Sequence, residues 1–164
     1  MNNSNQKTSI SQSKGFSLIE LIIVMVLIGI FSTIAMTRTN TGLLTIREQV
    51  AIDQITSDID LAKSMSFAKR ESIKLVFNIQ EESYSLYKGS SLISNFPNSD
   101  NGKINLDNSM LKNVDIQTVS FGESGSNELI FLPMGDLQSG GSIRLNTKII
   151  TVESVTGKWS VNEF

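Results

Sequence analysis

The sequence predicts an α+β protein in which a long N-terminal helix continues into an amphipathic helix packed on antiparallel β-sheets. Three observations lead to this fold class. An apolar run covers residues 16–35, and as a helix it would measure about 30 Å, the thickness of the bilayer hydrocarbon. Helical periodicity then covers residues 43–70, and alternating periodicity follows it. We therefore expect a membrane-spanning helix, an amphipathic helix and short strands, in that order.

Residues 1–15, before the apolar run, are rich in Asn, Ser, Gln and Thr. This composition offers almost nothing to bury, so we expect no fixed structure there. The segment contains Lys7 and Lys14 and no acidic residue, and Arg38 follows the apolar run. By the positive-inside rule this distribution favours a cytoplasmic N-terminus, with the globular part on the other side of the membrane. A secretory signal would have a shorter apolar region and a small-residue cleavage site after it.

The amphipathic helix is expected over residues 43–70. Its apolar residues recur at helical spacing on one face: Ile52, Ile55, Ile59 and Ala62. Asp53 and Asp60 fall on the opposite face, so the first face should pack on the core. Gly42 lies at the join with the apolar run and Gly29 lies inside that run, and glycine weakens a helix interior. We expect the helix to be softest at these two points.

After Arg70 the period changes to alternation, which predicts a strand with four apolar residues on one face: Ile73, Leu75, Phe77 and Ile79. Further short strands are expected at 83–87, 114–121, 128–132, 142–145, 148–154 and 158–161. Their even spacing favours antiparallel sheets packed on the amphipathic helix. Residues 90–108 are the least regular part and predict a long surface loop, with turns at Pro97 and Asn101-Gly102.

Cysteine and histidine are both absent from the 164 residues. This excludes thiol nucleophiles, thiolate or imidazole zinc sites, Ser-His-Asp triads and disulfides. Asp100-Asn101-Gly102 could belong to a calcium loop, but no complete set of oxygen ligands accompanies it, and a plain turn is the better interpretation. We therefore expect no enzymatic activity, no catalytic residue, no metal and no cofactor.

Lys14-Gly15 directly before Phe16, with Glu20 inside the apolar run, resembles the start of a type IV pilin or type II secretion pseudopilin precursor. The resemblance implies that a prepilin peptidase cuts between Gly15 and Phe16, removes the leader 1–15, and methylates the new amino group of Phe16. It further implies that 16–38 is the transmembrane and filament-core helix. Residues 39–164 would then form a periplasmic, pilin-like globular domain.

Four segments are similar to the helix-to-strand passage and the closing strands of GspH/FimT-like minor pseudopilins: 60–73, 130–135, 140–145 and 155–159. This resemblance implies a minor structural subunit of a type II secretion pseudopilus or a type IV pilus, which primes or caps filament assembly for protein secretion. Its partners would be the prepilin peptidase, other major and minor pilins or pseudopilins, the inner-membrane assembly platform, and membrane lipid before extraction into the filament.

The alternative is a FimT-like minor pilin that binds DNA for natural transformation. Arg144, Lys148 and Lys158 would be the binding residues if they converge on one face. The formal net charge is -2, however, and it becomes -4 without the two lysines of residues 1–15. The basic glycine-arginine motif of the DNA-binding members is also absent, since Gly157 is followed by Lys158 and Trp159. We therefore do not expect nucleic acid to be a partner.

Glu20 is the one carboxylate inside the apolar run. A charge there is unfavourable, which predicts a function and a partner for it. Cleavage before Phe16 would create an amino group one helical turn earlier, and in a filament the partner could be the Phe16 amine of a neighbouring subunit. The alternative is that Glu20 lies close enough to the lipid headgroups to stay hydrated. We expect Glu20 to act in subunit assembly.

Overall fold

The computed structural model describes residues 17–108 and 110–163, and it describes side chains for these residues except 35–41. Two compact units are present, residues 1–40 and 41–164. The long helix α1, Leu18–Lys69, contributes to both units. Its helical residues continue through Gly29 and Gly42, which we had expected to be soft points. Arg70 has a φ of 53°, the left-handed conformation that commonly ends a helix.

The sequence predicted a membrane-spanning helix over residues 16–38. Within the described part of the chain, no helix is both long enough and apolar enough to cross a membrane.

In the part of the chain that the structure describes, nine strands follow α1: β1 Ile73–Asn78, β2 Ser83–Lys88, β3 Ser91–Leu92, β4 Lys103–Asn105, β5 Thr118–Phe121, β6 Glu128–Phe131, β7 Gly141–Arg144, β8 Lys148–Val152 and β9 Trp159–Glu163. They form two antiparallel sheets. Sheet A has the order β3-β2-β1-β6, with β4 also paired to β2, and sheet B has the order β5-β7-β8-β9. The fold class predicted from the sequence is thereby confirmed for the globular unit.

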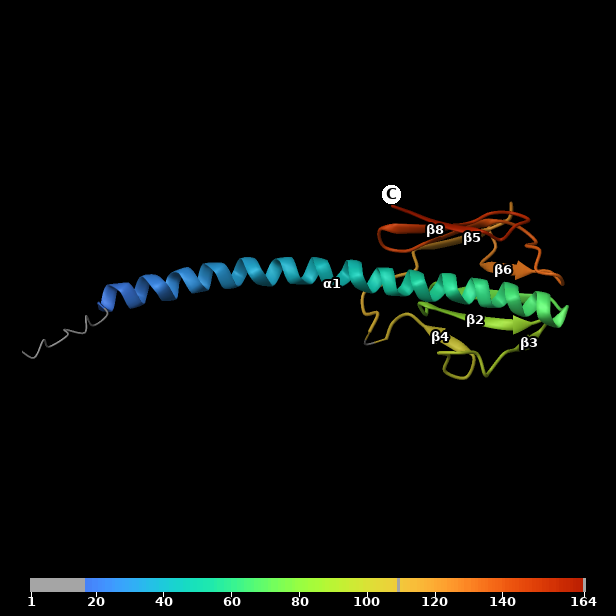
Figure 1. Ribbon diagram of the computed structural model, residues 1–164, viewed down its shortest axis with the longest axis horizontal. Helices are drawn as coiled ribbons and strands as arrows, with labels where there is room; N and C mark the ends of the chain where they lie inside the picture. Colours follow the sequence, from blue (N-terminus) through green and yellow to red (C-terminus); the bar gives the residue numbers. More distant parts are fainter. Residues whose placement is uncertain (1–16, 109, 164) are drawn as a thin grey trace, which may run out of the picture. The chain divides into compact units, whose positions relative to one another are not determined.

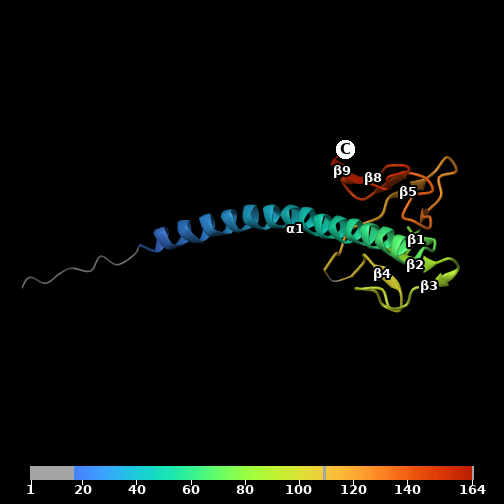
Figure 2. The ribbon, with the colours of Figure 1, turned by 45° about the vertical axis from the view of Figure 1, so that its right-hand side comes forward.

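The part of α1 after residue 41 runs across the globular unit, with β2, β3 and β4 on one side of it and β5, β6 and β8 on the other in Figure 1, and Figure 2 gives a view turned by 45°. Ile52, Ile55 and Ile59 are fully buried in one hydrophobic core that receives side chains from both sheets. Asp53 and Asp60 are exposed, so the predicted division of the helix into two faces is confirmed. The helix is thus the common support of sheets A and B.

The loop predicted over residues 90–108 was partly wrong, because it contains β3 and β4. Phe96, Ile104 and Leu106 are buried, and these apolar side chains draw the segment onto β2. Asn101-Gly102 forms the predicted turn: Asp100 and Lys103 exchange two backbone hydrogen bonds of 2.8 and 3.0 Å across it. The segment therefore adds two short strands, β3 and β4, to β2 in sheet A.

Two strand predictions also needed correction. Ile79 does not continue β1, because the side chain of Asn78 accepts hydrogen bonds from the backbone N–H groups of Gln80 and Glu81 and turns the chain. Ile79 is therefore exposed. The strand predicted from residue 114 begins only at Thr118, although Val114 and Ile116 are buried as a strand would bury them.

Candidate functional site

The first candidate site is the start of α1. Gly15 and Phe16 lie outside the described residues, and Glu20 lies in the first turn of the helix. The carbonyl of Ser17 accepts hydrogen bonds from the N–H groups of Glu20 and Leu21 at 3.0 and 3.2 Å. A carboxylate in the first helical turn is stabilised by the positive end of the helix dipole. The position of Glu20 therefore gives it a second favourable interaction that the sequence analysis did not consider.

Every side chain from Leu18 to Ile34 is exposed in the unit that contains Glu20. Large apolar side chains occur all around this stretch, from Leu18 at 76% exposure to Val24 at 45%. A helix that is apolar on all sides is stable only where apolar groups cover it. This stretch is thus a surface built for burial against something outside the chain.

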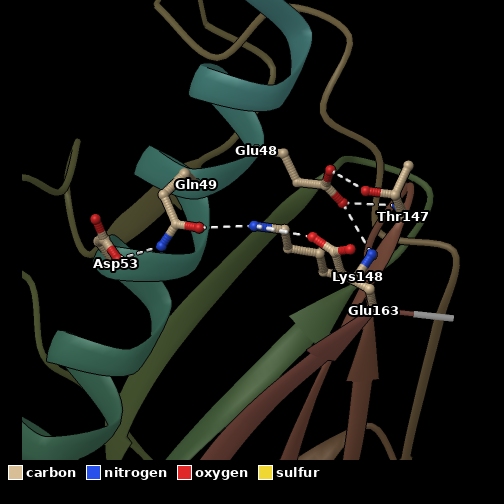
Figure 3. A network of polar contacts seen from close by, with 6 residues as sticks. All are labelled: Glu48, Gln49, Asp53, Thr147, Lys148 and Glu163. Carbon is tan, nitrogen blue, oxygen red and sulfur yellow. Dashed lines mark hydrogen bonds and ion pairs between the residues drawn. The ribbon is translucent and has the colours of Figure 1, made fainter.

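The second candidate site is the contact of α1 with sheet B, where Glu48 is buried with 3% exposure. Its carboxylate accepts hydrogen bonds from the backbone N–H of Thr147 at 2.7 Å, the Thr147 hydroxyl at 2.5 Å and the Lys148 N–H at 3.1 Å (Figure 3). Hydrogen bonds to an ionised group are the strong ones, and they compensate a buried charge. Glu48 therefore fixes the turn between β7 and β8 on the helix.

Lys148, one of the three basic residues singled out from the sequence, belongs to this same network. Its ammonium donates to Gln49 Oε1 at 2.8 Å and lies 4.0 Å from Glu163 Oε1, and Gln49 Nε2 in turn donates to Asp53 Oδ1 at 2.9 Å (Figure 3). Only 14% of the Lys148 side chain is exposed. Its charge is thus directed toward α1 and is engaged there.

Arg144 and Lys158 are exposed, but the structure does not bring them together with Lys148. Arg144 lies opposite Ile149 in the register of β7 and β8, whereas the carbonyl of Lys158 accepts a hydrogen bond from the N–H of Glu153. The two partners, Ile149 and Glu153, are four residues apart, which is about 13 Å along an extended strand. Arg144 alternates with buried Ile143, so it points away from the core, opposite to Lys148.

Sequence reasoning missed a third polar group, which lies inside the core. Asp58 Oδ2 accepts hydrogen bonds from Tyr84 Oη at 2.5 Å and Gln54 Nε2 at 2.8 Å, and Asp58 is 4% exposed. Burial raises the pKa of the Asp58 carboxyl, while the hydrogen bonds from Tyr84 and Gln54 oppose this shift. Burial, followed by the charge of Asp58, raises the pKa of Tyr84 well above its ordinary value. One signal was present, because Asp58 follows Ile55 by three residues and borders the apolar face.

The chemical capacity of these groups is limited. Among residues 17–108 and 110–163, no three His, Cys, Asp or Glu side chains come together as a metal site would require. Asp58 and Tyr84 are closed off in the core, and the carboxylate of Glu48 is occupied by its three donors. In the described part of the chain, the arrangement is suited to holding surfaces in place, and the exposed apolar helix is suited to association.

Comparison with known proteins gives two findings. The sequence model described as the prokaryotic N-terminal methylation motif matches residues 10–36, the stretch that contains Gly15, Phe16 and Glu20. The minor pseudopilin EpsH from the type 2 secretion system of Vibrio cholerae has a similar structure. Its TM-score is 0.51 at 9% sequence identity, and the match covers 71% of this chain and 97% of that chain.

Two crystal structures of the type IV minor pilin FimU of Pseudomonas aeruginosa also match, with TM-scores of 0.45 and 0.46. Their sequence identities are 13% and 15%, and the matches cover 71% and 70% of this chain and 87% and 91% of theirs. No curated protein matches the chain significantly.

The chain thus combines a segment that matches an N-terminal methylation motif with an α+β domain whose fold is similar to that of a minor pseudopilin. The motif over residues 10–36 and the fold shared with EpsH support assignment of the chain to the type IV pilin and pseudopilin superfamily. Members of this superfamily are structural filament subunits and not enzymes. The motif implies processing by a prepilin peptidase and assembly with other pilins or pseudopilins, and it is consistent with membrane anchoring.

Proposed function

We propose that this chain is a minor pilin-like subunit of a type II secretion pseudopilus or a type IV pilus, and that it primes or caps filament assembly. The observation that carries the proposal is the methylation motif over residues 10–36 joined to a helix whose apolar side chains are exposed on all sides. Such a helix is stable in lipid or among other apolar helices, which are the two environments of a pilin before and after assembly.

Before assembly the subunit is held in the inner membrane by residues 16–38, with its N-terminus cytoplasmic and residues 39–164 periplasmic. The predominantly apolar sequence from Phe16 to Ala35 supports this location, as do Lys7 and Lys14 before it. The assembly platform then moves the helix from lipid into the filament, where neighbouring helices replace the lipid.

Glu20 guides this step in the proposed mechanism. Cleavage before Phe16 creates a positive amino group, and the Glu20 carboxylate of one subunit pairs with the Phe16 amine of a neighbour. In an apolar helix bundle an unpaired carboxylate is strongly unfavourable, so the pairing selects the depth at which each new helix enters. The first-turn position of Glu20 supports this role, because it brings the carboxylate to the end of the helix where that amine would be.

Processing provides the test. Coexpression with a prepilin peptidase should remove residues 1–15 and leave a methylated Phe16, as read by mass spectrometry of the N-terminus. Gly15→Val should block the cut. Gly29→Ala is the matched control, because no atom lies within 4 Å of a Cβ added at Gly29. A chain that keeps Met1, or one that is cut after Ala35, would contradict the proposal.

DNA binding is not proposed. The three basic residues do not converge, since Lys148 is engaged by Gln49 and Glu163 on the side of sheet B that faces α1. Phosphate binding requires several accessible cations along one surface.

A further inference from the structure

Three large apolar side chains are exposed around the C-terminal end of α1, although each could have been polar without loss to the core. Phe67 on α1 is 62% exposed, Met134 in the turn after β6 is 57% exposed, and Val155 in the turn after β8 is 70% exposed. We name these three residues the Phe67 patch. All three belong to the globular unit, so their arrangement is that of a single compact body.

The patch is contiguous around Lys63 and Gly135. Phe67 and Met134 line one pocket of about 270 Å³ together with these two residues and Ser64. The Lys63 ammonium donates to the Thr156 carbonyl at 2.6 Å, next to Val155. Leu137, two residues after Gly135, donates its N–H to the Val155 carbonyl at 3.3 Å. Phe67 and Met134 thus share one apolar pocket, and Val155 belongs to the segment that Lys63 and Leu137 hold beside it through backbone hydrogen bonds.

Backbone strain supports a role for this surface. Met134 and Val155 have φ values of 86° and 71°, in the left-handed region that glycine adopts far more readily. A β-branched residue there is a conformational outlier, and such strain accumulates at binding sites. Neither side chain gains burial in return, since both are exposed. The chain therefore holds two apolar side chains outward at a conformational disadvantage.

The pocket also has a basic residue, Lys63, at its rim. Lys74, Lys88, Lys103 and Lys148 each lie within ion-pair distance of a carboxylate of the chain. Lys63 has no such pair among the described residues, and its solvent-accessible ammonium has the Thr156 carbonyl as hydrogen-bond acceptor. An ammonium at the rim of an apolar pocket complements a carboxylate that accompanies an apolar group.

We propose that the Phe67 patch binds the globular domain of a neighbouring pilin-like subunit, which inserts one apolar side chain between Phe67 and Met134 and places a carboxylate on Lys63. The inference rests on the proposed function, because it takes the occupant from the filament. A pocket of this volume accommodates one large side chain, whereas small-molecule sites are mostly larger and deeper. An apolar anchor with a charge at its edge is the usual centre of a protein interface.

Site-specific crosslinking tests the occupant. A photoreactive amino acid replaces Phe67 in the full chain, in cells that assemble the filament, and the same group at Leu92 on sheet A serves as the control. We expect a crosslink from position 67 to the globular domain of a different pilin-like subunit, identified by peptide mass spectrometry. Lys63→Glu should reduce it about tenfold, and Lys112→Glu should not. A crosslink to lipid, to a second copy of this chain, or to nothing overturns the proposal.

Glycine substitutions separate binding from folding. Met134→Gly and Val155→Gly relieve the left-handed strain, so the melting temperature of each variant should stay the same or rise. Each variant should nevertheless reduce copurification with the neighbouring subunit by about tenfold. Met110→Gly, at another exposed methionine, should leave copurification unchanged.

The same copurification experiment distinguishes failure of the patch inference from failure of the proposed function. Normal copurification of both patch variants, with an assembled wild type, would overturn the inference about the patch alone. Failure of the wild-type chain to copurify with any filament subunit would overturn the proposed function and the inference together.

Discussion

The Glu48 carboxylate binds the backbone N–H and the hydroxyl of Thr147, a residue 99 positions later in the chain. This buried contact joins the first core-facing turns of the globular part of α1 to the turn between β7 and β8. Because the bonds run from a helix to a reverse turn, they fix both the position of sheet B and the start of β8. Glu48 therefore helps to place sheet B on the helix, in addition to the side chains that this sheet contributes to the core.

Removal of this carboxylate should destabilise the globular domain. Glu48→Ala removes three part-buried hydrogen bonds to an otherwise buried carboxylate and should lower the free energy of unfolding by about 2 kcal/mol. The measurement is urea unfolding of residues 41–164, which form a unit with its own core. Glu123→Ala, in an exposed loop, is the control and should change stability little. Equal stability of the two variants would show that the Glu48 bonds contribute nothing net.

Asp58 should make the domain less stable as pH rises. Burial raises the pKa of Asp58 above 3.8, so above that pH the folded state retains the proton more strongly than the unfolded state. The contribution of Asp58 is therefore fully present below this value and is lost as pH rises through the raised pKa. Asp58→Asn removes the titration while its amide oxygen can still accept from Tyr84 and Gln54.

The measurement is the free energy of unfolding of wild type and Asp58→Asn at several pH values from about 4 to 7. The free energy of unfolding of Asp58→Asn minus that of the wild type should increase with pH. Asp53→Asn, on the exposed face of the same helix, should show no such trend. Parallel curves for Asp58→Asn and wild type would exclude Asp58 as the titrating group.

Duplex DNA should bind the globular domain poorly at physiological salt. Arg144 lies opposite Ile149 and Lys158 opposite Glu153, so the two are separated along the strand direction, and Lys148 is engaged with α1. Lys148→Ala should therefore lower the free energy of unfolding by about 1 kcal/mol and leave DNA affinity unchanged. An anisotropy titration at two salt concentrations decides the matter. Micromolar binding that weakens steeply with salt and disappears on changing these three residues would restore the DNA alternative.

Glu20→Ala should leave insertion and the cut after Gly15 intact but reduce incorporation into the filament. The expectation follows from the proposed pairing with the Phe16 amine of a neighbour, which alanine cannot make. Glu20→Asp keeps the charge on a shorter side chain and should be partly tolerated. Copurification with other filament subunits is measured next to the mass of the processed N-terminus. If Glu20→Ala incorporates normally, the carboxylate does not set the register of assembly.

The elements that were predicted well are those in which apolar residues repeat at a regular spacing along the sequence. Ile52, Ile55 and Ile59 repeat at helical spacing and are buried, and Asp53 falls opposite to them. Turn residues were also readable, as at Asn101-Gly102, because their backbone conformation depends on neighbours in the sequence. Local physics was sufficient in these cases.

The buried charges could not be predicted in the same way. Glu48 and Asp58 each find their partners far along the chain, at Thr147 and at Tyr84, and no local period reveals such a distance. The direction of the Lys148 side chain could not be predicted for the same reason, since it depends on which face of sheet B meets α1. Val155 presents a different case, because its left-handed conformation contradicts the preference of its side chain.

The continuity of α1 has a mechanical consequence. One helix carries the methylation motif at its start and supplies Ile52, Ile55 and Ile59 to the core near its end. Within residues 41–164, a pulling force on the N-terminal side of the helix is therefore transmitted along covalent bonds and helical hydrogen bonds into the domain interior. Among the described side chains of α1 from Gly42 onward, Glu48 is the first buried one, so its bonds to Thr147 resist sliding of the helix past sheet B under load.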